Sequence, residues 1–100
     1  MYERALIIEL LARGHKVDTQ KPFAVYYKEQ LIGKLVPDLI VDGLVIVDTK
    51  VVTAFNDTFF AQMLGYLNIT NLQLALLLNF KYSQLQWKRI VRETSAIANQ

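Results

Sequence analysis

Three charged side chains interrupt apolar stretches of this chain, and their types and spacing could support metal-dependent chemistry. Asp38 lies among aliphatic residues, and ten residues later Asp48 and then Lys50 interrupt a second aliphatic stretch. An isolated carboxylate in such surroundings is costly, so a partner or a metal ion is expected beside it. Two carboxylates could hold Mg²⁺, which prefers oxygen ligands and keeps several waters. The lysine could then orient or deprotonate a water that attacks a phosphodiester, while the metal stabilises the developing charge.

The register between two strands decides whether these side chains meet. Asp48 and Lys50 are two residues apart and share one face of a strand, whereas Asp38 belongs to the preceding strand. The Asp-Gly pair at residues 42–43 predicts a hairpin between them. A two-residue turn would place the carboxylates on opposite faces, so the site requires a three-residue connection or a bulge, for which Pro37 is a natural position. The alternative is an ion pair of Lys50 with either aspartate at the rim of the sheet, without a metal.

Two helices are expected beside these strands. The first covers residues 2–13 and ends at Gly14, which suits a left-handed cap. It starts with no capping residue before it, which indicates either an N-terminally shortened chain or a missing partner segment. The second covers residues 59–68, after a cluster of N-cap residues at 56–58. Its apolar residues recur at helical spacing, and the expected core residues are Phe59, Phe60 and Met63.

The strands and helices together predict a single α/β domain. Strands are expected at residues 23–28, 31–41, 44–52, 72–80 and 85–92. The order is then α-β-β-β-α-β-β, a mixed sheet with flanking helices, in which residues 44–80 form a right-handed parallel crossover. The domain is expected to cover residues 1–93, and residues 94–100 to form a C-terminal tail.

Composition excludes several classes of protein. The chain has 100 residues, of which 53% are hydrophobic and 20% charged, too apolar for a disordered segment. No apolar run reaches the roughly 20 residues of a membrane helix, and the first residues do not form a signal peptide. Without cysteine there is no disulfide, thiolate nucleophile or zinc knuckle, and we expect a cytoplasmic protein. The net charge of +2 favours a polyanionic partner only weakly.

The order of the motifs resembles a known group of enzymes. The sequence has Pro-Asp at residues 37–38, Asp-Thr-Lys at 48–50 and Gln-Met-Leu-Gly-Tyr at 62–66. This pattern resembles the PD-(D/E)XK nuclease superfamily, with the Q-x-x-x-Y helix of its RecB-like branch. Over most of its length the chain is similar to the GxxExxY protein family of that superfamily.

The resemblance implies a restriction-endonuclease-like fold, a divalent cation (Mg²⁺ or Mn²⁺) and hydrolysis of phosphodiester bonds in DNA. It also assigns roles to individual residues of this chain. These are Asp38, Asp48 and the Thr49 carbonyl as metal ligands, Lys50 as the catalytic lysine, and Gln62 and Tyr66 as contacts to the substrate or to the site.

Two departures from the family pattern bear on activity. The family usually has Glu where this chain has Asp48, and the shorter side chain changes the distance to a metal, although the superfamily motif admits either acid. Most of the motif that names the family lies before Tyr2, so its Gly, its Glu and the helix that contains them are absent from this sequence. If that Glu is the superfamily's first-helix acid, Glu3 is the only nearby substitute.

Other noticeable residues have simpler interpretations. His15, the only histidine, lies in a polar turn and is expected at the surface rather than as a general base. Tyr26 and Tyr27 point to opposite faces of one strand, so at most one can join a site, and packing is the favoured interpretation. Trp87 and its basic neighbours could form a nucleic-acid surface. We favour the alternative that they keep an edge strand soluble.

The sequence therefore supports hypotheses from different classes of function. The first is a Mg²⁺-dependent deoxyribonuclease. The second is a catalytically inactive nuclease fold that binds nucleic acid or a protein partner, which the absent helix and Asp48 both favour. The third is an interaction protein whose exposed apolar surface pairs with a second copy in a homodimer.

Overall fold

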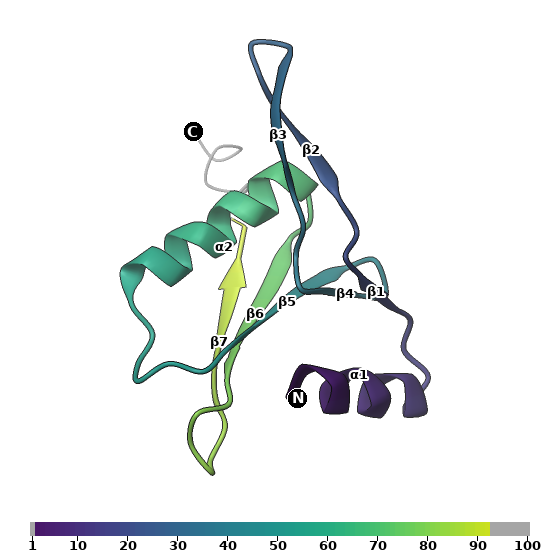
Figure 1. The fold of residues 1–100 in the computed structure, drawn as a ribbon, viewed down its shortest axis with the longest axis vertical. Helices are drawn as coiled ribbons and strands as arrows, with labels where there is room; N and C mark the ends of the chain where they lie inside the picture. Colours follow the sequence, from purple (N-terminus) through teal and green to yellow (C-terminus); the bar gives the residue numbers. More distant parts are fainter. Residues whose placement is uncertain (1, 93–100) are drawn as a thin grey trace, which may run out of the picture.

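The computed structural model describes residues 2–92, which form a five-stranded mixed sheet and two helices. Along the chain the elements are α1 (Tyr2–Ala12), β1 (Val17–Thr19), β2 (Phe23–Tyr27), β3 (Gln30–Leu35), β4 (Leu39–Val41), β5 (Val45–Lys50), α2 (Asp57–Thr70), β6 (Leu74–Asn79) and β7 (Gln86–Val91). The sheet order is β1-β4-β5-β6-β7, while β2 and β3 pair only with each other (Figure 1). The α/β fold class is confirmed, and the tail expected at residues 94–100 lies outside the described residues.

The order of elements differs from the expected one by two additional strands. The stretch expected as one strand over residues 31–41 is divided into β3 and β4, because Pro37 lies between them and has no N–H for a strand ladder. The short strand β1 was not expected. The corrected order is α-β-β-β-β-β-α-β-β. The crossover from β5 through α2 to β6 is parallel, as expected, and β6 lies in the interior of the sheet.

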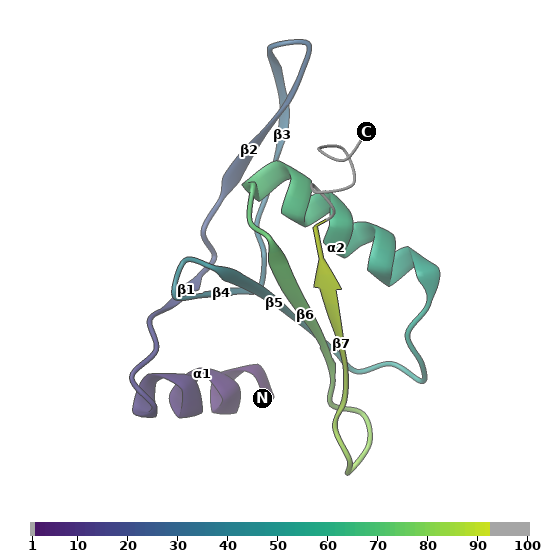
Figure 2. The same cartoon turned by 180° about the vertical axis from the view of Figure 1, so that it is seen from behind.

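Each face of the sheet carries its own apolar cluster under one helix (Figures 1 and 2). On one face, α2 buries Met63 and Leu67 completely against Ile40, Ile46, Ala75, Leu77 and Ile90. On the other face, α1 packs Leu6, Ile7 and Leu10 against Leu39, Val41, Val47 and Leu78. Because Asp48 and Lys50 follow Ile46 at two-residue steps, both charged residues lie on the α2 face.

One end of each helix is capped by a residue that the sequence indicates. Gly14 has φ +87°, and the bonds His15 N–H to Leu10 and Gly14 N–H to Leu11, both 3.0 Å, form a Schellman motif. At the start of α2, Asn56 accepts a 3.1 Å bond from the backbone N–H of Phe59. These caps fix where each helix begins or ends. Of the expected core residues in α2, Met63 is fully buried, and Phe59 and Phe60 pack against the same cluster.

The turn between β4 and β5 has the length that the site requires. The register pairs Leu39 with Val47 and Val41 with Val45, which leaves a three-residue connection at 42–44. The Asp42 side chain accepts a 2.9 Å bond from the N–H of Lys16 and lies 2.7 Å from Nδ1 of His15. His15 is therefore a surface residue that ties α1's C-terminal loop to this turn.

The β2–β3 hairpin projects from the rest of the molecule in both views (Figures 1 and 2). Its two-residue turn consists of Lys28 and Glu29, with φ of 49° and 66°, and its ladder shifts register between Val25 and Tyr26. Tyr26 and Tyr27 are 63% and 62% exposed. The expectation that they pack is wrong, because no described layer covers this part of the hairpin.

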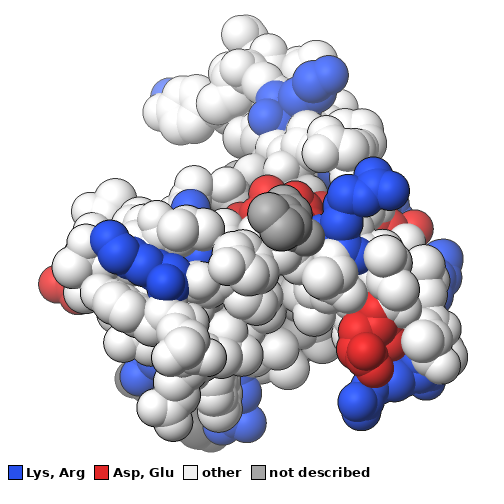
Figure 3. All heavy atoms as spheres, turned by 60° about the horizontal axis from the view of Figure 1, so that its bottom comes forward, with Lys and Arg blue, Asp and Glu red and all other residues white. Residues whose placement is uncertain are grey.

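β7 is an edge strand, as expected, and Trp87 lies exposed on it. On the face shown in Figure 3, lysines and arginines occur in separate groups with acidic residues between them rather than as one patch. Within residues 2–92, no helix is long and apolar enough to cross a membrane.

Candidate active site

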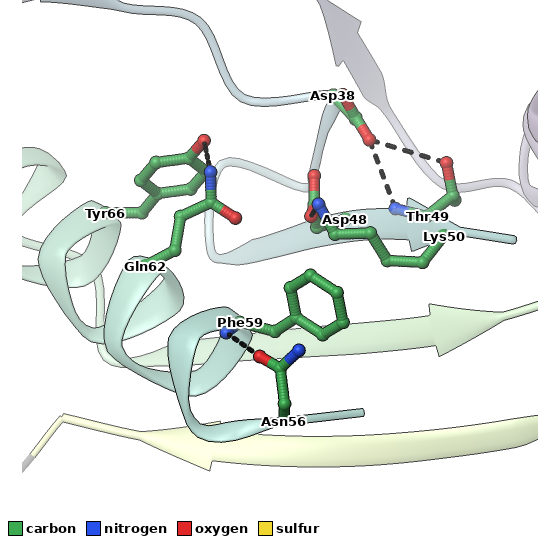
Figure 4. Close-up of polar contacts among 8 residues, drawn as sticks. All are labelled: Asp38, Asp48, Thr49, Lys50, Asn56, Phe59, Gln62 and Tyr66. Carbon is green, nitrogen blue, oxygen red and sulfur yellow. Dashed lines mark hydrogen bonds and ion pairs between the residues drawn. The ribbon is translucent and has the colours of Figure 1, made fainter. Parts of the chain in front are cut away.

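The turn and the strand register bring Asp38 and Asp48 together. Continuing the β4–β5 pairing by one position places Asp38, just before β4, opposite Asp48 on β5. Oδ2 of Asp38 accepts a 3.1 Å bond from the backbone N–H of Thr49, which holds the carboxylate against β5 (Figure 4). The Thr49 hydroxyl contacts the same oxygen at 3.4 Å. The structure therefore unites two predicted site residues that are ten positions apart in the sequence.

Asp48 is a buried carboxylate with an incompletely satisfied oxygen. The residue is only 5% exposed, and Nζ of Lys50 lies 3.1 Å from its Oδ2. Among the described residues, no donor meets that oxygen in hydrogen-bond geometry. Burial, together with the neighbouring Asp38 carboxyl, raises the pKa of Asp48 to about 6, and Lys50 opposes this shift. This position therefore favours a bound positive charge.

Lys50 is held between a carboxylate and an aromatic ring. It lies on the same face of β5 as Asp48, and its ammonium group is 5.1 Å from the centroid of the Phe59 ring. Phe59 is in the first turn of α2, directly at the capped end of the helix. The sequence indicated Phe59 only as a core residue, because a ring beneath a lysine depends on how α2 lies over β5.

Gln62 and Tyr66 lie one helical turn apart on the side of α2 that faces the carboxylates (Figure 4). Nε2 of Gln62 donates a 2.9 Å bond to the Tyr66 hydroxyl. Burial and the charge of Asp48 raise the pKa of Tyr66. Both residues of the Q-x-x-x-Y motif thus lie beside the carboxylates, and the Tyr66 proton remains available to a further acceptor.

Asn79 is a buried polar residue next to the site that was not singled out in the sequence. It pairs with Lys50 across the β5–β6 ladder and is fully buried. Its side chain accepts bonds from the N–H groups of Val52 (3.1 Å) and Lys81 (3.2 Å) and donates to the Val52 carbonyl (2.7 Å) and to Gln86 Oε1 (3.0 Å). Asn79 therefore fixes the backbone immediately after Lys50. The sequence feature that could have indicated Asn79 is a single amide side chain at the end of an apolar strand.

One known protein family matches most of the chain. The family model described as the PD-(D/E)XK nuclease superfamily matches residues 1–90. The chain belongs to this superfamily. No curated protein sequence matches the chain.

The PD-(D/E)XK domain is also similar to solved structures. The alkaline exonuclease LHK-Exo from Laribacter hongkongensis has a TM-score of 0.65 and 15% identity, with 96% of this chain and 57% of that chain covered. Its complex with dAMP has a TM-score of 0.66 and 15% identity, with 96% and 56% covered. The structure of SSO0001 has a TM-score of 0.70 and 12% identity, with 98% and 52% covered. These likenesses show the fold, and the domain spans little more than half the length of these chains.

The residues of this PD-(D/E)XK domain fit a divalent metal ion, which the superfamily generally uses. The buried Oδ2 of Asp48 lacks a hydrogen bond, and Mg²⁺ is commonly held by one or two carboxylates and waters. The strand register also favours the Thr49 carbonyl as a metal ligand. The position opposite Thr49 is Pro37, which has no N–H that could bond to this carbonyl. Among the described residues, no third His, Cys, Asp or Glu gathers with the two acids, so Glu3 does not complete the set.

Proposed function

We propose that this domain is a divalent-metal-dependent nuclease that hydrolyses phosphodiester bonds in DNA, and that it belongs to the GxxExxY family. One observation carries the proposal: Asp38, Asp48 and Lys50 converge at one end of the sheet, around a buried carboxylate oxygen that lacks a hydrogen bond. The exonuclease fold of LHK-Exo supports the same class of reaction. A cytoplasmic location is part of this proposal.

Each residue of the site has a distinct role in the proposed reaction. Asp38, Asp48 and the Thr49 carbonyl would hold Mg²⁺ or Mn²⁺. When bound, the cation supplies positive charge that stabilises the negative charge developing on the phosphate oxygens. Lys50 is fixed between Asp48 and Phe59, where its Nζ can orient the attacking water or take up its proton.

The Q-x-x-x-Y pair would position the substrate. Because the Tyr66 oxygen accepts its bond from Gln62, the Tyr66 proton can be donated to a phosphate oxygen. Removing either side chain should therefore weaken substrate binding more than metal binding.

The proposal is tested by separating metal binding from cleavage. Titration of Mg²⁺ or Mn²⁺ followed by calorimetry should show saturable binding to the wild type and none to Asp48→Asn. Lys50→Met should keep metal binding but lose about 10²- to 10⁴-fold in cleavage rate, because it removes a proton-transfer group and no ligand. Single-stranded, duplex and branched DNA are the substrates, and EDTA should abolish cleavage of each.

Glu9→Gln is the control, because Glu9 is an exposed carboxylate on α1 that forms an ion pair with Arg13. It should match the wild type in both assays. Metal binding that survives in folded Asp48→Asn contradicts the assigned ligands, whereas metal binding without cleavage of any DNA contradicts the proposed activity.

A second function is favoured by the absence of a third acid among the described residues at the site. The chain would then be an inactive nuclease fold that binds nucleic acid or a protein, including a second copy of itself. This alternative predicts DNA binding or a concentration-dependent mass in a protein that cleaves none of the three substrates.

A further inference from the structure

The β2–β3 hairpin presents one of its two faces to the side of the sheet that carries the site. Phe23 at the base of β2 packs against the apolar cluster under α2. The register shift leaves Ile32 of β3 without a partner, so side chains still alternate along β2. Tyr27 then shares the face of Phe23, whereas Tyr26 points the opposite way with Leu31, its partner on β3. Tyr27 is therefore the tyrosine on the side of Asp38, Asp48 and Lys50.

The exposed end of the hairpin combines aromatic and positively charged groups. Residues 21–35 contain three lysines and one acidic residue; Lys28 and Glu29 form the tip, whereas Lys21 and Lys34 lie nearer the base. Nζ of Lys28 lies 5.5 Å from the centroid of the Tyr27 ring and covers one side of it. Tyr27 is 62% exposed, so it is accessible to a planar partner. Lysine beside an exposed aromatic ring suits a single-stranded polynucleotide, which offers phosphates and unpaired bases.

The turn at the tip holds Lys28 and Glu29 in a conformation that has an energetic cost. Lys28 and Glu29 both have positive φ, a conformation that favours Asn and Gly and is unfavourable for longer side chains. Asn-Gly at these positions would relieve the cost but would remove the lysine from the tip.

We propose that the Tyr27 face of the hairpin holds an unpaired stretch of the polynucleotide outside the catalytic centre. Tyr27 stacks on a base and Lys28 contacts an adjacent phosphate. This inference rests on the proposed function, because it extends the path of the substrate beyond Asp38 and Asp48.

The distance along β3 between Tyr27 and Asp38 determines how many nucleotides are needed to contact both places. The chain runs from Gln30, opposite Tyr27, to Asp38. At about 3.3 Å per residue this is at most roughly 25 Å. A stacked strand advances about 3.4 Å per nucleotide, so roughly seven nucleotides connect the two places.

The test is the affinity of fluorescein-labelled oligo(dT) of 12 nucleotides, measured by fluorescence anisotropy in EDTA. Because EDTA removes metal ions, the oligonucleotide is not cleaved and its binding is measured independently of cleavage. Tyr27→Ala should bind about five- to a hundredfold more weakly, as expected for loss of one stacked base. Tyr27→Phe should bind like the wild type, because the ring is kept. Lys28→Ala should reduce the slope of log affinity against log salt by about one.

Tyr26→Ala is the matched control, since Tyr26 is the adjacent residue with the same exposure on the opposite face. It should stay within about twofold of the wild type, and an oligo(dT) of four nucleotides should not distinguish any of the variants. Equal loss in Tyr26→Ala and Tyr27→Ala, no loss in either, or a preference for blunt duplex over oligo(dT) overturns the inference. Loss only in Tyr27→Ala, in a protein that cleaves no DNA, keeps the inference and rejects the proposed activity.

Discussion

Asp48 carries a carboxylate that is almost completely removed from water, beside a second acid and 3.1 Å from an ammonium group. Burial and the Asp38 carboxyl favour its protonated form, and only Lys50 favours the charged form. A divalent cation would take the place of the proton. Asp38, in contrast, is oriented by a hydrogen bond from a backbone N–H.

The raised pKa of Asp48 predicts a dependence of stability on pH. The pKa is about 6 in the folded chain against 3.8 for an ordinary aspartate, so the folded state holds the proton more strongly between these values. The free energy of unfolding should therefore fall as pH rises from about 4 to 6, by up to about 3 kcal/mol. Thermal unfolding in EDTA between pH 3.5 and 7 measures this fall.

Asp48→Asn is the control variant for that series, because it keeps the shape of the side chain and cannot titrate. Its melting temperature should change less than that of the wild type over the same pH range. Parallel curves for the two proteins would show that Asp48 has an ordinary pKa in the folded state.

The sequence predicted the residues of this site better than their surroundings. Asp38, Asp48 and Lys50 could be singled out because charges within apolar strands are costly and need an explanation. Asn79 follows an apolar strand at a position where a polar residue is common, so nothing local indicated its four hydrogen bonds. Such bonds depend on where the chain returns after β5, which is a property of the folded molecule.

The start of α2 links the secondary structure to the site. Asn56 caps the N–H of Phe59, and the Phe59 ring lies under Lys50. Asn56→Ala should lower the free energy of unfolding by about 1 kcal/mol, which urea denaturation measures. Thr58→Ala, two residues along on the exposed side of the first turn, should change it by less than about half of that. Equal effects of the two substitutions would contradict a specific cap.

Asn79 links β6 to the chain segment that follows β5. Asn79→Ala would remove the bonds to the part-buried N–H and carbonyl of Val52, and should cost about 2–3 kcal/mol in urea denaturation. Gln86→Ala removes one bond of the same network from an exposed position, and should cost less than about 1 kcal/mol. If Asn79→Ala is no more harmful than Gln86→Ala, water replaces the network and Asn79 does not fix the segment.

Helices and strands could be predicted from the sequence where the pattern of apolar residues was long. The helix expected at residues 59–68 is α2, extended to Asp57–Thr70, because apolar spacing and the caps agree. β1 has only three residues and no apolar alternation, so it exists through its pairing with β4. The Asp-Gly pair indicated a hairpin but not its length, since the turn also includes Leu44, whose N–H bonds to the Val41 carbonyl at 3.0 Å.

At the scale of the whole molecule, stability depends on two thin apolar layers on either side of one sheet. Leu67 of α2 is completely buried, whereas Leu64 on the same helix is 42% exposed. Leu67→Ala should cost about 2–5 kcal/mol, a large share of the total for a domain of this size. Leu64→Ala should cost about 1 kcal/mol or less. Urea denaturation of both proteins measures the difference, and similar midpoints would contradict a core centred on Leu67.

The fold class followed from the alternation of helical and strand patterns, and the continuous apolar strand β6 indicated a sheet covered on both faces. The separate β2–β3 hairpin could not be predicted in the same way. Its apolar residues look like those of a core strand, and Tyr26 and Tyr27 are exposed because nothing within residues 2–92 forms a layer over them. Periodicity reports which residues share a face but not what lies against that face.

Because β7 is an edge strand, its tryptophan can serve as an intrinsic fluorescence probe. Trp87 is the only tryptophan of the chain and is 61% exposed on this strand. Its indole is already in contact with water in the native state, so its fluorescence emission should hardly change when the domain unfolds. Circular dichroism would follow unfolding better. The same indole should respond strongly to any molecule that settles against β7, because such contact would exclude water from it. Intrinsic fluorescence of this protein should thus report association rather than denaturation.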